Sequence, residues 1–268
     1  MPGLANHPSE KTTTPLPETT IDFLGVAIAP LNLEQALDRV DQMARSDRFS
    51  YVVTPNVDHF VNLYPEVYDV RTKAFRDAYE AASLTLCDSR IVRALARFAG
   101  IELTVVPGSD MTAALFQKRL GQGDQVAIIG GDKSLLNDLS RLFPKPSYVQ
   151  HIPPMGVLNK PEAISDIVQF IEDTNAHYVL LAIGSPQSEI IAHKCQQSGK
   201  CSGVALCIGA SLEFITSAKK RAPIWMQKAG LEWSFRLLSE PSRLWRRYLV
   251  EGPRIFKIFL AHNKSGKP

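Results

Sequence analysis

The sequence predicts an α/β protein with a mainly parallel β-sheet, flanking helices and a basic helical C-terminal appendage. Three observations support this prediction. Short β-rich segments alternate with helix-like segments along most of the 268 residues. Several β-rich segments are apolar throughout, as expected for parallel strands that helices cover on both faces. The net charge changes sign near residue 218, where the body ends and the appendage begins.

The expected strands are short runs of apolar and β-branched residues, each followed by a helix-like stretch such as 33–44 or 163–172. They lie at residues 23–29, 51–54, 84–87, 103–106, 126–129, 178–183 and 204–208. No linker divides this body, and no repeat of about 20–50 residues is apparent. We therefore expect one Rossmann-like domain over residues 21–218, preceded by a disordered tail over residues 1–20 and followed by an appendage over residues 219–268.

The composition excludes several classes of protein. With 45% hydrophobic and 21% charged residues, the chain is neither collagen-like, mucin-like nor wholly disordered. Four cysteines, at positions 87, 195, 201 and 207, form no CxxC pair and have no histidine at zinc-ligand spacing. We expect reduced thiols and no metal site. Because no apolar run reaches the roughly 20 residues that span a bilayer and no secretory signal is apparent, we expect a cytoplasmic protein.

Charge is distributed unevenly between body and appendage. Residues 219–268 carry 12 Lys and Arg against Glu232, Glu240 and Glu251, which gives a net charge of +9. The first 218 residues then carry 18 basic and 24 acidic residues, a net charge of −6. A basic segment of this kind suits nucleic acid, anionic lipid or a phosphorylated substrate, and charge alone does not distinguish the three.

Five strand-to-helix junctions carry polar or glycine-rich segments. In an open α/β sheet the ligand lies where strands end and helices begin, so these segments mark the expected site. Glycines there let backbone N–H groups approach a diphosphate, and nearby carboxylates and amides can contact ribose or base or act in catalysis. A single glycine after a strand is more often only a turn, and Asp88 alone would more often cap a helix. The segments are 54–56, 87–90, 130–132, 184–189 and 209–213.

Two common nucleotide-binding motifs are absent. The first strand-to-helix junction, at residues 29–32, carries no GxGxxG, and GxxxxGK[ST] occurs nowhere in the sequence. These absences argue against a typical dinucleotide oxidoreductase and against a P-loop NTPase. A nucleotide must then be held in another way. The sequence also has no GxSxG elbow and no HExxH motif.

The appendage carries the most distinctive motifs, which are RAPxW, GLEW, EPxR and RRY within residues 221–248. The body adds FLGV, TPN, VPGSD, IIGGD, IGSPQSE and IGASLEF. Over nearly the whole chain these motifs resemble the WecG/TagA/CpsF glycosyltransferase family. The resemblance implies an inverting, metal-independent transferase with no cofactor. Such an enzyme moves a sugar from a UDP-sugar to a polyprenyl-diphosphate-linked acceptor at the cytoplasmic membrane face, in surface polysaccharide or cell-wall polymer biosynthesis.

The resemblance also assigns candidate site residues by position. The family's proposed general base falls on Asp88, and its Thr-x-Asn motif falls on Thr54 and Asn56. Such a base takes the proton from the acceptor hydroxyl as it attacks the anomeric carbon opposite UDP. The expected nucleotide-sugar contacts are Gly130, Gly131, Gly184, Gln187 and Glu213. Arginine suits a diphosphate because its planar guanidinium binds in a bidentate manner, and the expected acceptor and diphosphate contacts are Arg236, Arg243, Arg246 and Arg247.

The sequence departs from the family pattern in three places. Glycine commonly follows the aspartate, whereas Ser89-Arg90 stand here, and Arg90 can bind an acidic sugar or simply pair with the base. The usual PKQE reads PQSE, so Gln187 precedes the position of the family's glutamine, which aligns with Ser188. The usual Phe-Asp reads Leu-Glu, so Glu213 keeps the carboxylate with one more methylene.

Alternatives remain open from the sequence alone. The resemblance leaves open whether the donor sugar is of the N-acetylmannosamine type or is a related hexose or uronic acid, and the sequence does not determine the oligomeric state. The basic appendage also suits a non-catalytic α/β protein that binds nucleic acid or anionic lipid. Its apolar stripe is typical of a helix that packs against its own domain, whereas segment 254–260 mixes bulky apolar groups with cations and favours an anionic lipid surface. We expect a peripheral membrane enzyme with no nucleic-acid partner.

Overall fold

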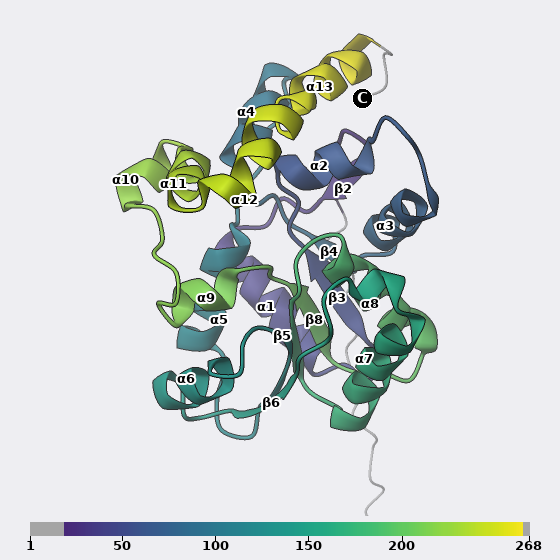
Figure 1. Cartoon of the computed structure of the whole chain (residues 1–268), viewed down its shortest axis with the longest axis vertical. Helices are drawn as coiled ribbons and strands as arrows, with labels where there is room; N and C mark the ends of the chain where they lie inside the picture. Colours follow the sequence, from purple (N-terminus) through teal and green to yellow (C-terminus); the bar gives the residue numbers. More distant parts are fainter. Residues whose placement is uncertain (1–18, 265–268) are drawn as a thin grey trace, which may run out of the picture.

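The centre of the structure, a computed structural model that describes residues 19–264, is a six-stranded sheet whose strands are all parallel (Figure 1). The strand order is β4-β3-β8-β7-β5-β6. Most of the expected N-terminal tail and the last four residues lie outside the described residues. The predicted α/β class is confirmed. The strands are β3 (Ser50–Val53), β4 (Leu84–Thr85), β5 (Gln125–Gly130), β6 (Ser147–His151), β7 (Tyr178–Ala182) and β8 (Val204–Cys207).

Helices cover both faces of this sheet. Successive residues of a strand point to opposite faces, so Val126 and Ile128 of β5 join one core cluster while Ala127 and Ile129 join the other. This explains why the strands read as continuous apolar runs. The first cluster packs against α1 (Leu33–Ala44), α5 (Gly108–Lys118) and α6 (Leu135–Leu142). The second packs against α2 (Val57–Leu63), α3 (Val70–Glu80), α4 (Arg90–Phe98), α7 (Pro161–Thr174) and α8 (Gln187–Ser198).

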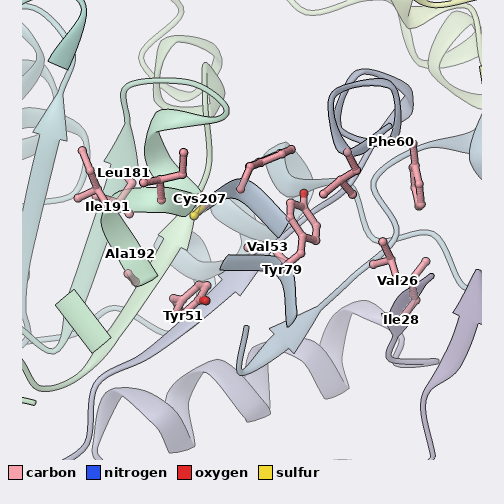
Figure 2. Packing of buried hydrophobic residues seen from close by; sticks show 14 of the residues in the cluster. Val26, Ile28, Tyr51, Val53, Phe60, Tyr79, Leu181, Ile191, Ala192 and Cys207 are labelled. Atoms are coloured by element: carbon pink, nitrogen blue, oxygen red, sulfur yellow. The ribbon is translucent and has the colours of Figure 1, made fainter. Parts of the chain in front are cut away.

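The second cluster lies directly beneath the edge of the sheet that carries the candidate site residues. Figure 2 shows part of it, in which Tyr51 and Val53 of β3 and Cys207 of β8 lie near Tyr79 of α3. Tyr51 and Val53 are fully buried, and the four are members of one continuous core. A close-packed core of this kind holds the ends of β3 and β8 in fixed positions.

Two expected strands were wrong and one strand was missed. Residues 23–29 form not one strand but an antiparallel hairpin of β1 (Ile21–Phe23) and β2 (Val26–Ile28), separate from the main sheet. Leu24 and Gly25 both have positive φ, which a tight two-residue hairpin turn requires. Residues 103–106 make only a single bridge, from Val105 to Cys87. The missed strand, β6, lies at the sheet edge, and its partly exposed sequence lacks a clear apolar run.

The appendage is helical. Its elements are α10 (Ile224–Lys228), α11 (Glu232–Ser239), α12 (Pro241–Trp245), the π-helical η2 (Arg246–Glu251) and α13 (Arg254–Lys264). It follows α9 (Ser211–Ile215), and the short η1 (Val157–Asn159) completes the set of helices. Figure 1 shows α10 to α13 gathered at one end of the molecule, beside α4 and α2. Within the described residues, no helix is long and apolar enough to cross a membrane.

The last helix packs against the body rather than lying free. Ile255 and Phe259 of α13 are 1% and 8% exposed and join the second core cluster, where Phe259 lies 6.3 Å from the ring of Phe23. Phe256 and Leu260, on the other side of the helix, are more than half exposed. Segment 254–260, which we expected to favour an anionic lipid surface, therefore uses one face to pack against the body and leaves the other face exposed. Residues four apart share a helix face, and that face is used for packing.

Candidate active site

Three of the expected site residues meet at the carboxyl edge of the sheet, where β3 and β4 end. The Asp88 carboxyl accepts a hydrogen bond from the Asn56 side-chain amide, with 3.4 Å between Nδ2 and Oδ2. The backbone N–H of Asp88 donates to the carbonyl of Pro55 at 3.1 Å. Thr54 immediately follows β3 and is 7% exposed. The structure thus brings Thr54, Asn56 and Asp88 together, as the motifs led us to expect.

Gly108, the first residue of α5, completes this group. Its backbone N–H donates to Oδ1 of Asp88 at 2.7 Å. A Cβ atom at this position would lie only 2.9 Å from Oγ1 of Thr54, so only glycine fits without displacing that side chain. The VPGSD motif therefore places a glycine N–H where it can bind the candidate base. The VPGSD motif is visible in the sequence, but nothing in it predicts this role for Gly108.

Asn56 is held in place by its position as the N-cap of α2. Its Oδ1 accepts from the backbone N–H of Asp58 at 3.0 Å, which leaves its amide nitrogen directed at Asp88. Its own backbone N–H donates to Nδ1 of His59 at 3.1 Å, so the two residues form a capping box. The cap that starts the helix thus also orients the group that contacts the candidate base.

Burial raises the pKa of the Asp88 carboxyl above its ordinary value of 3.8. The hydrogen bonds from Gly108 and Asn56, and the nearby charge of Arg236, partly offset this effect because they favour the ionised form. A carboxylate whose pKa is raised binds a proton more strongly than an ordinary aspartate does. That is the property needed by a general base that removes a hydroxyl proton near neutral pH.

The residues expected to contact the nucleotide fall into two groups. Gly130 and Gly131 have positive φ, and added Cβ atoms would meet Ile183 at 2.8 Å and Leu135 at 2.3 Å, so chain conformation and packing already require glycine at both. Gly184 also has positive φ, but a Cβ there would meet nothing within 4 Å. The backbone at Gly184 therefore borders open space, as a ligand-facing turn would.

Gln187 and Ser188 have different surroundings. Ser188 is 1% exposed, and its hydroxyl donates to the carbonyl of Leu181 at 3.2 Å, so it is directed into the core. Gln187 begins α8, and its Oε1 is buried without a hydrogen-bond partner among the described residues; the same holds for Oγ of Ser185. Buried polar atoms without partners are costly unless a ligand satisfies them. Of the two positions, Gln187 is the one available to a ligand.

Glu213 makes an ion pair with the beginning of the appendage. Its Oε2 lies 2.7 Å from Nζ of Lys219, which also lies 3.2 Å from Oε1 of Glu240. The carboxyl expected to contact ribose is thus paired with a lysine in this structure. Because all three side chains are partly exposed, the interaction is weak enough for a ligand to replace.

The four appendage arginines differ in position. The guanidinium of Arg236 lies 5.5 Å from the Phe214 ring centre, and its charge lowers the pKa of Asp88. Arg247 makes a 3.1 Å ion pair with Asp58, at the beginning of α2. The other two are more exposed and pair within the appendage, Arg243 with Glu240 at 2.5 Å and Arg246 with Glu251 at 3.0 Å. The structure therefore brings Arg236 and Arg247 to the site edge, and Arg243 and Arg246 to local ion pairs.

A comparison with protein families agrees with this arrangement. The family model described as "Glycosyl transferase WecG/TagA/CpsF family" matches residues 21–267 of the 268. The chain belongs to this family. It is therefore a glycosyltransferase with a sugar donor and an acceptor as substrates, and membership supports a role in surface-polymer synthesis.

A set of ion pairs that the sequence did not predict joins the appendage of this glycosyltransferase to the body beside the site. Arg221 lies 2.5 Å from Asp110 of α5 and 3.8 Å from Glu232 of α11. Burial raises the pKa of Glu232, Arg221 partly opposes this, and the negative charge of Asp88 raises it further. Glu232 is thus a second carboxyl close enough to the candidate base to interact with it electrostatically. The GLEW motif contained this residue, but nothing in its spacing predicted the contact.

Arg90 takes a position that the sequence left open. A Cβ atom at Gly230 would lie 3.6 Å from Cβ of Arg90, so the loop before α11 packs against the beginning of α4. In the described part of the chain, no ion pair joins Arg90 to Asp88, and the Arg90 side chain is exposed.

Two surface hollows of the glycosyltransferase lie away from the edge of the sheet that carries Asp88. One lies between α7 and α8, and the other lies beside Arg45 and His177.

Proposed function

We propose that this glycosyltransferase is an inverting, metal-independent enzyme that transfers a sugar from a UDP-sugar to a polyprenyl-diphosphate-linked acceptor. The observation that carries the proposal is the environment of Asp88. This carboxyl lies at the carboxyl edge of a parallel sheet, has a raised pKa, and is held by Gly108 and Asn56. Such a group can take the proton of the acceptor hydroxyl while the oxygen attacks the anomeric carbon.

The departing UDP needs positive charge or hydrogen-bond donors to stabilise its diphosphate. Arg236 supplies a cation close to Asp88, and Arg247 supplies one beside Asp58. The unpartnered Oε1 of Gln187 and the open turn at Gly184 fit the nucleotide portion of the donor. In this proposal the donor lies along the ends of β3, β5, β7 and β8, and the acceptor approaches from the appendage.

The appendage supports a location at the inner face of the cell membrane. More than half of the large hydrophobic side chains that are exposed in the described residues belong to residues 224–260. Trp225, Leu238 and Trp245 are 65%, 79% and 51% exposed, within a segment whose net charge is strongly positive. Exposed aromatic and aliphatic groups among cations are typical of a surface that lies on anionic lipid. A polyprenyl-linked acceptor is presented at such a surface.

The test is release of UDP from a panel of UDP-sugars, in which N-acetylmannosamine, hexose and uronic-acid donors are each offered with a polyprenyl-diphosphate-sugar acceptor. We expect acceptor-dependent release with one donor class. Asp88→Asn should lower turnover by about 10²-fold or more, with UDP affinity nearly unchanged. Near wild-type turnover in a folded Asp88→Asn protein would remove Asp88 from this role, and no release with any UDP-sugar would contradict the proposed donor class.

A binding assay separates this function from the alternatives. A ligand that binds only the folded state raises the thermal midpoint, and the rise grows as its concentration exceeds its Kd. We expect UDP to raise the midpoint, and NAD and oligonucleotides to leave it unchanged. Stabilisation by oligonucleotides alone would favour a non-catalytic nucleic-acid-binding protein.

A further inference from the structure

A chain of polar contacts, made of two partly buried hydrogen bonds and a histidine–glutamate ion-pair contact, runs from the candidate base into the interior of the protein. From Asp88 it passes to the Asn56 side chain, and from the Asn56 backbone N–H to Nδ1 of His59 at 3.1 Å. It ends at Glu189, whose Oε1 lies 3.3 Å from Nε2 of His59. Three different elements, α2, α8 and the segment after β4, contribute to this chain, which brings together residues far apart in the sequence.

Packing alone does not explain why a histidine and a glutamate are buried at the inner end of this series of contacts. Glu189 is 2% exposed and His59 is 8% exposed, and Oε2 of Glu189 has no hydrogen-bond partner among the described residues. A carboxyl group buried with so few partners lowers stability relative to an apolar side chain of the same size. The His59 ring itself is well held, since the rings of Phe75 and Tyr79 each lie 6.3 Å from it.

The hydrogen bonds define which nitrogen of His59 carries the proton. Because the Asn56 backbone N–H donates to Nδ1, that nitrogen acts as an acceptor. The ring proton is then on Nε2, the nitrogen that lies 3.3 Å from Oε1 of Glu189. Glu189 therefore fixes both the tautomer and the orientation of His59, and His59 in turn fixes the Asn56 backbone.

We propose that His59 and Glu189 are positioning residues, which hold Asn56 so that its side-chain amide donates to Asp88. This inference rests on the proposed role of Asp88 as the base. Neither residue touches the substrate in this scheme; both act through Asn56. The arrangement accounts for a buried glutamate whose contribution to packing is unfavourable, because its benefit lies in the geometry of the site.

Other groups also act on Asp88, and all of them except Tyr79, which is changed only in the control variant, stay unchanged in the test. Arg236 and Glu232 face it from α11, Tyr79 interacts with it from α3, and the Gly108 N–H binds it from α5. Cys87 adjoins it on its own segment. A change in the Asp88 titration or in turnover that is caused by His59 must therefore be separated from one that is caused by a general disturbance of these neighbouring groups.

Four variants make that separation. His59→Phe keeps an aromatic ring but removes both ring nitrogens. His59→Gln restores an acceptor for Asn56 and a donor for Glu189, since glutamine is a usual residue at this position of a capping box. Glu189→Met removes the carboxyl at similar volume, a change that often preserves folding. Tyr79→Phe is the matched control, because it alters a buried neighbour of His59 whose hydroxyl has no partner among the described residues.

Two readouts are measured on the full chain. The first is the titration of the Asp88 carboxyl carbon by NMR with ¹³C-labelled aspartate, assigned through its absence in Asp88→Asn. The second is turnover and KM for the UDP-sugar. The Asn56 amide lowers the pKa of Asp88, so its loss should move the titration midpoint to higher pH. His59 also lowers this pKa directly, so Glu189→Met, which keeps His59, is the variant that isolates the Asn56 contact. We expect this shift in His59→Phe and Glu189→Met, with turnover reduced about tenfold or more and KM within about threefold.

His59→Gln and Tyr79→Phe should titrate and turn over as the wild type does. The inference is overturned if Glu189→Met, or a folded His59→Phe, leaves the Asp88 midpoint and turnover unchanged. It is also overturned if His59→Gln loses as much turnover as His59→Phe with no change in midpoint, because that pattern describes a structural role only. If the wild type releases no UDP at all, the proposed function fails, and the titration still decides whether His59 and Glu189 act on Asp88.

Discussion

The backbone N–H of Gly108 donates a 2.7 Å hydrogen bond to Oδ1 of Asp88, and this contact joins the beginning of α5 to the segment that precedes α4. The carboxyl thereby lies at the N-terminal end of an 11-residue helix, where the helix dipole favours a negative charge. Burial acts in the opposite direction and has the larger effect, so the pKa of Asp88 is raised. The contact therefore orients the carboxyl and prevents a still larger rise.

This balance predicts how Asp88 affects stability at different pH values. Because its pKa is raised in the folded state, ionising Asp88 costs more there than in the unfolded chain, whose aspartates titrate near pH 3.9. Below the unfolded pKa the group has no effect, and as the pH rises toward the folded pKa it lowers the free energy of unfolding. Above the folded pKa the loss is complete.

Asp88→Asn lacks this titration, so urea unfolding of the two proteins between about pH 4 and pH 8 measures it. We expect the free energy of unfolding, wild type minus variant, to fall with rising pH and then to level off. Altered hydrogen bonding in the variant adds a constant offset, and the interaction with Glu232 acts in the same direction as the Asp88 titration, since the Asp88 charge raises the pKa of Glu232. A difference that rises with pH, or stays flat, would show that the folded pKa is not raised.

Gly108 provides a second prediction, through its contact with Thr54. A methyl group at position 108 would lie 2.9 Å from Oγ1 of Thr54, closer than packed atoms tolerate. We expect Gly108→Ala to lower the free energy of unfolding by about 1–3 kcal/mol, as other overpacked positions do, and to reduce turnover because Thr54 and Asp88 both move.

Gly121→Ala is the control for this prediction. Gly121 has no positive φ, and its nearest neighbour would lie 3.9 Å from the added methyl. It should keep wild-type turnover and stability in the same thermal melting and UDP-release assays. Equal behaviour of the two alanine variants would mean that the Gly108 contact does not constrain the site.

The sequence predicted the parallel sheet, its helical layers and the meeting of Thr54, Asn56 and Asp88, because strand ends of parallel strands share one edge. It could not predict the proposed role of Glu189, since that role depends on α8 packing against α3 and on a single side-chain contact with His59 of α2. No motif or periodic pattern near either residue in the sequence predicts such a contact. The PQSE motif drew attention to Gln187 instead.

The sequence also could not predict where the appendage packs on the body. Its motifs and charge were visible, yet the pairs Arg221–Asp110 and Arg247–Asp58 join residues more than 100 positions apart and follow no periodic pattern. Likewise, the sequence of segment 254–260 does not show which of its bulky apolar side chains are buried and which are exposed. Only the packed structure shows that Ile255 and Phe259 are buried while Phe256 and Leu260 face outward.

Gln187 and Ser188 carry a third prediction. Oε1 of Gln187 is buried without a partner among the described residues, whereas the Ser188 hydroxyl donates to Leu181 in the core. If Gln187 contacts the nucleotide, Gln187→Ala should weaken UDP binding by about 1 kcal/mol, roughly fivefold in Kd. Ser188→Ala should lower the thermal midpoint but leave the Kd for UDP unchanged. Isothermal titration calorimetry measures the Kd of each variant and thermal melting measures the midpoint. A weakened Kd in Ser188→Ala with an unchanged Kd in Gln187→Ala would assign the contact to Ser188.

The last prediction concerns the membrane-facing side of the appendage. Cutting the chain after Ala218 would remove Ile255 and Phe259 from the core beside Phe23, so we expect that truncated protein to aggregate. Vesicle binding is better tested on the full chain, with glutamate substituted at exposed positions. Trp225→Glu with Leu238→Glu changes two side chains that are 65% and 79% exposed.

This double variant should keep its thermal midpoint and lose binding to anionic vesicles in a sedimentation assay, because it removes apolar contact and adds negative charge. Leu142→Glu is the control, since Leu142 is 46% exposed on α6, away from the appendage (Figure 1). Wild-type binding should weaken as the screening length falls from about 30 Å at 0.01 M salt to about 8 Å at 0.15 M. Should the double variant sediment with vesicles as fully as the wild type does, these appendage side chains do not form the lipid contact, and the acceptor must reach Asp88 by another face.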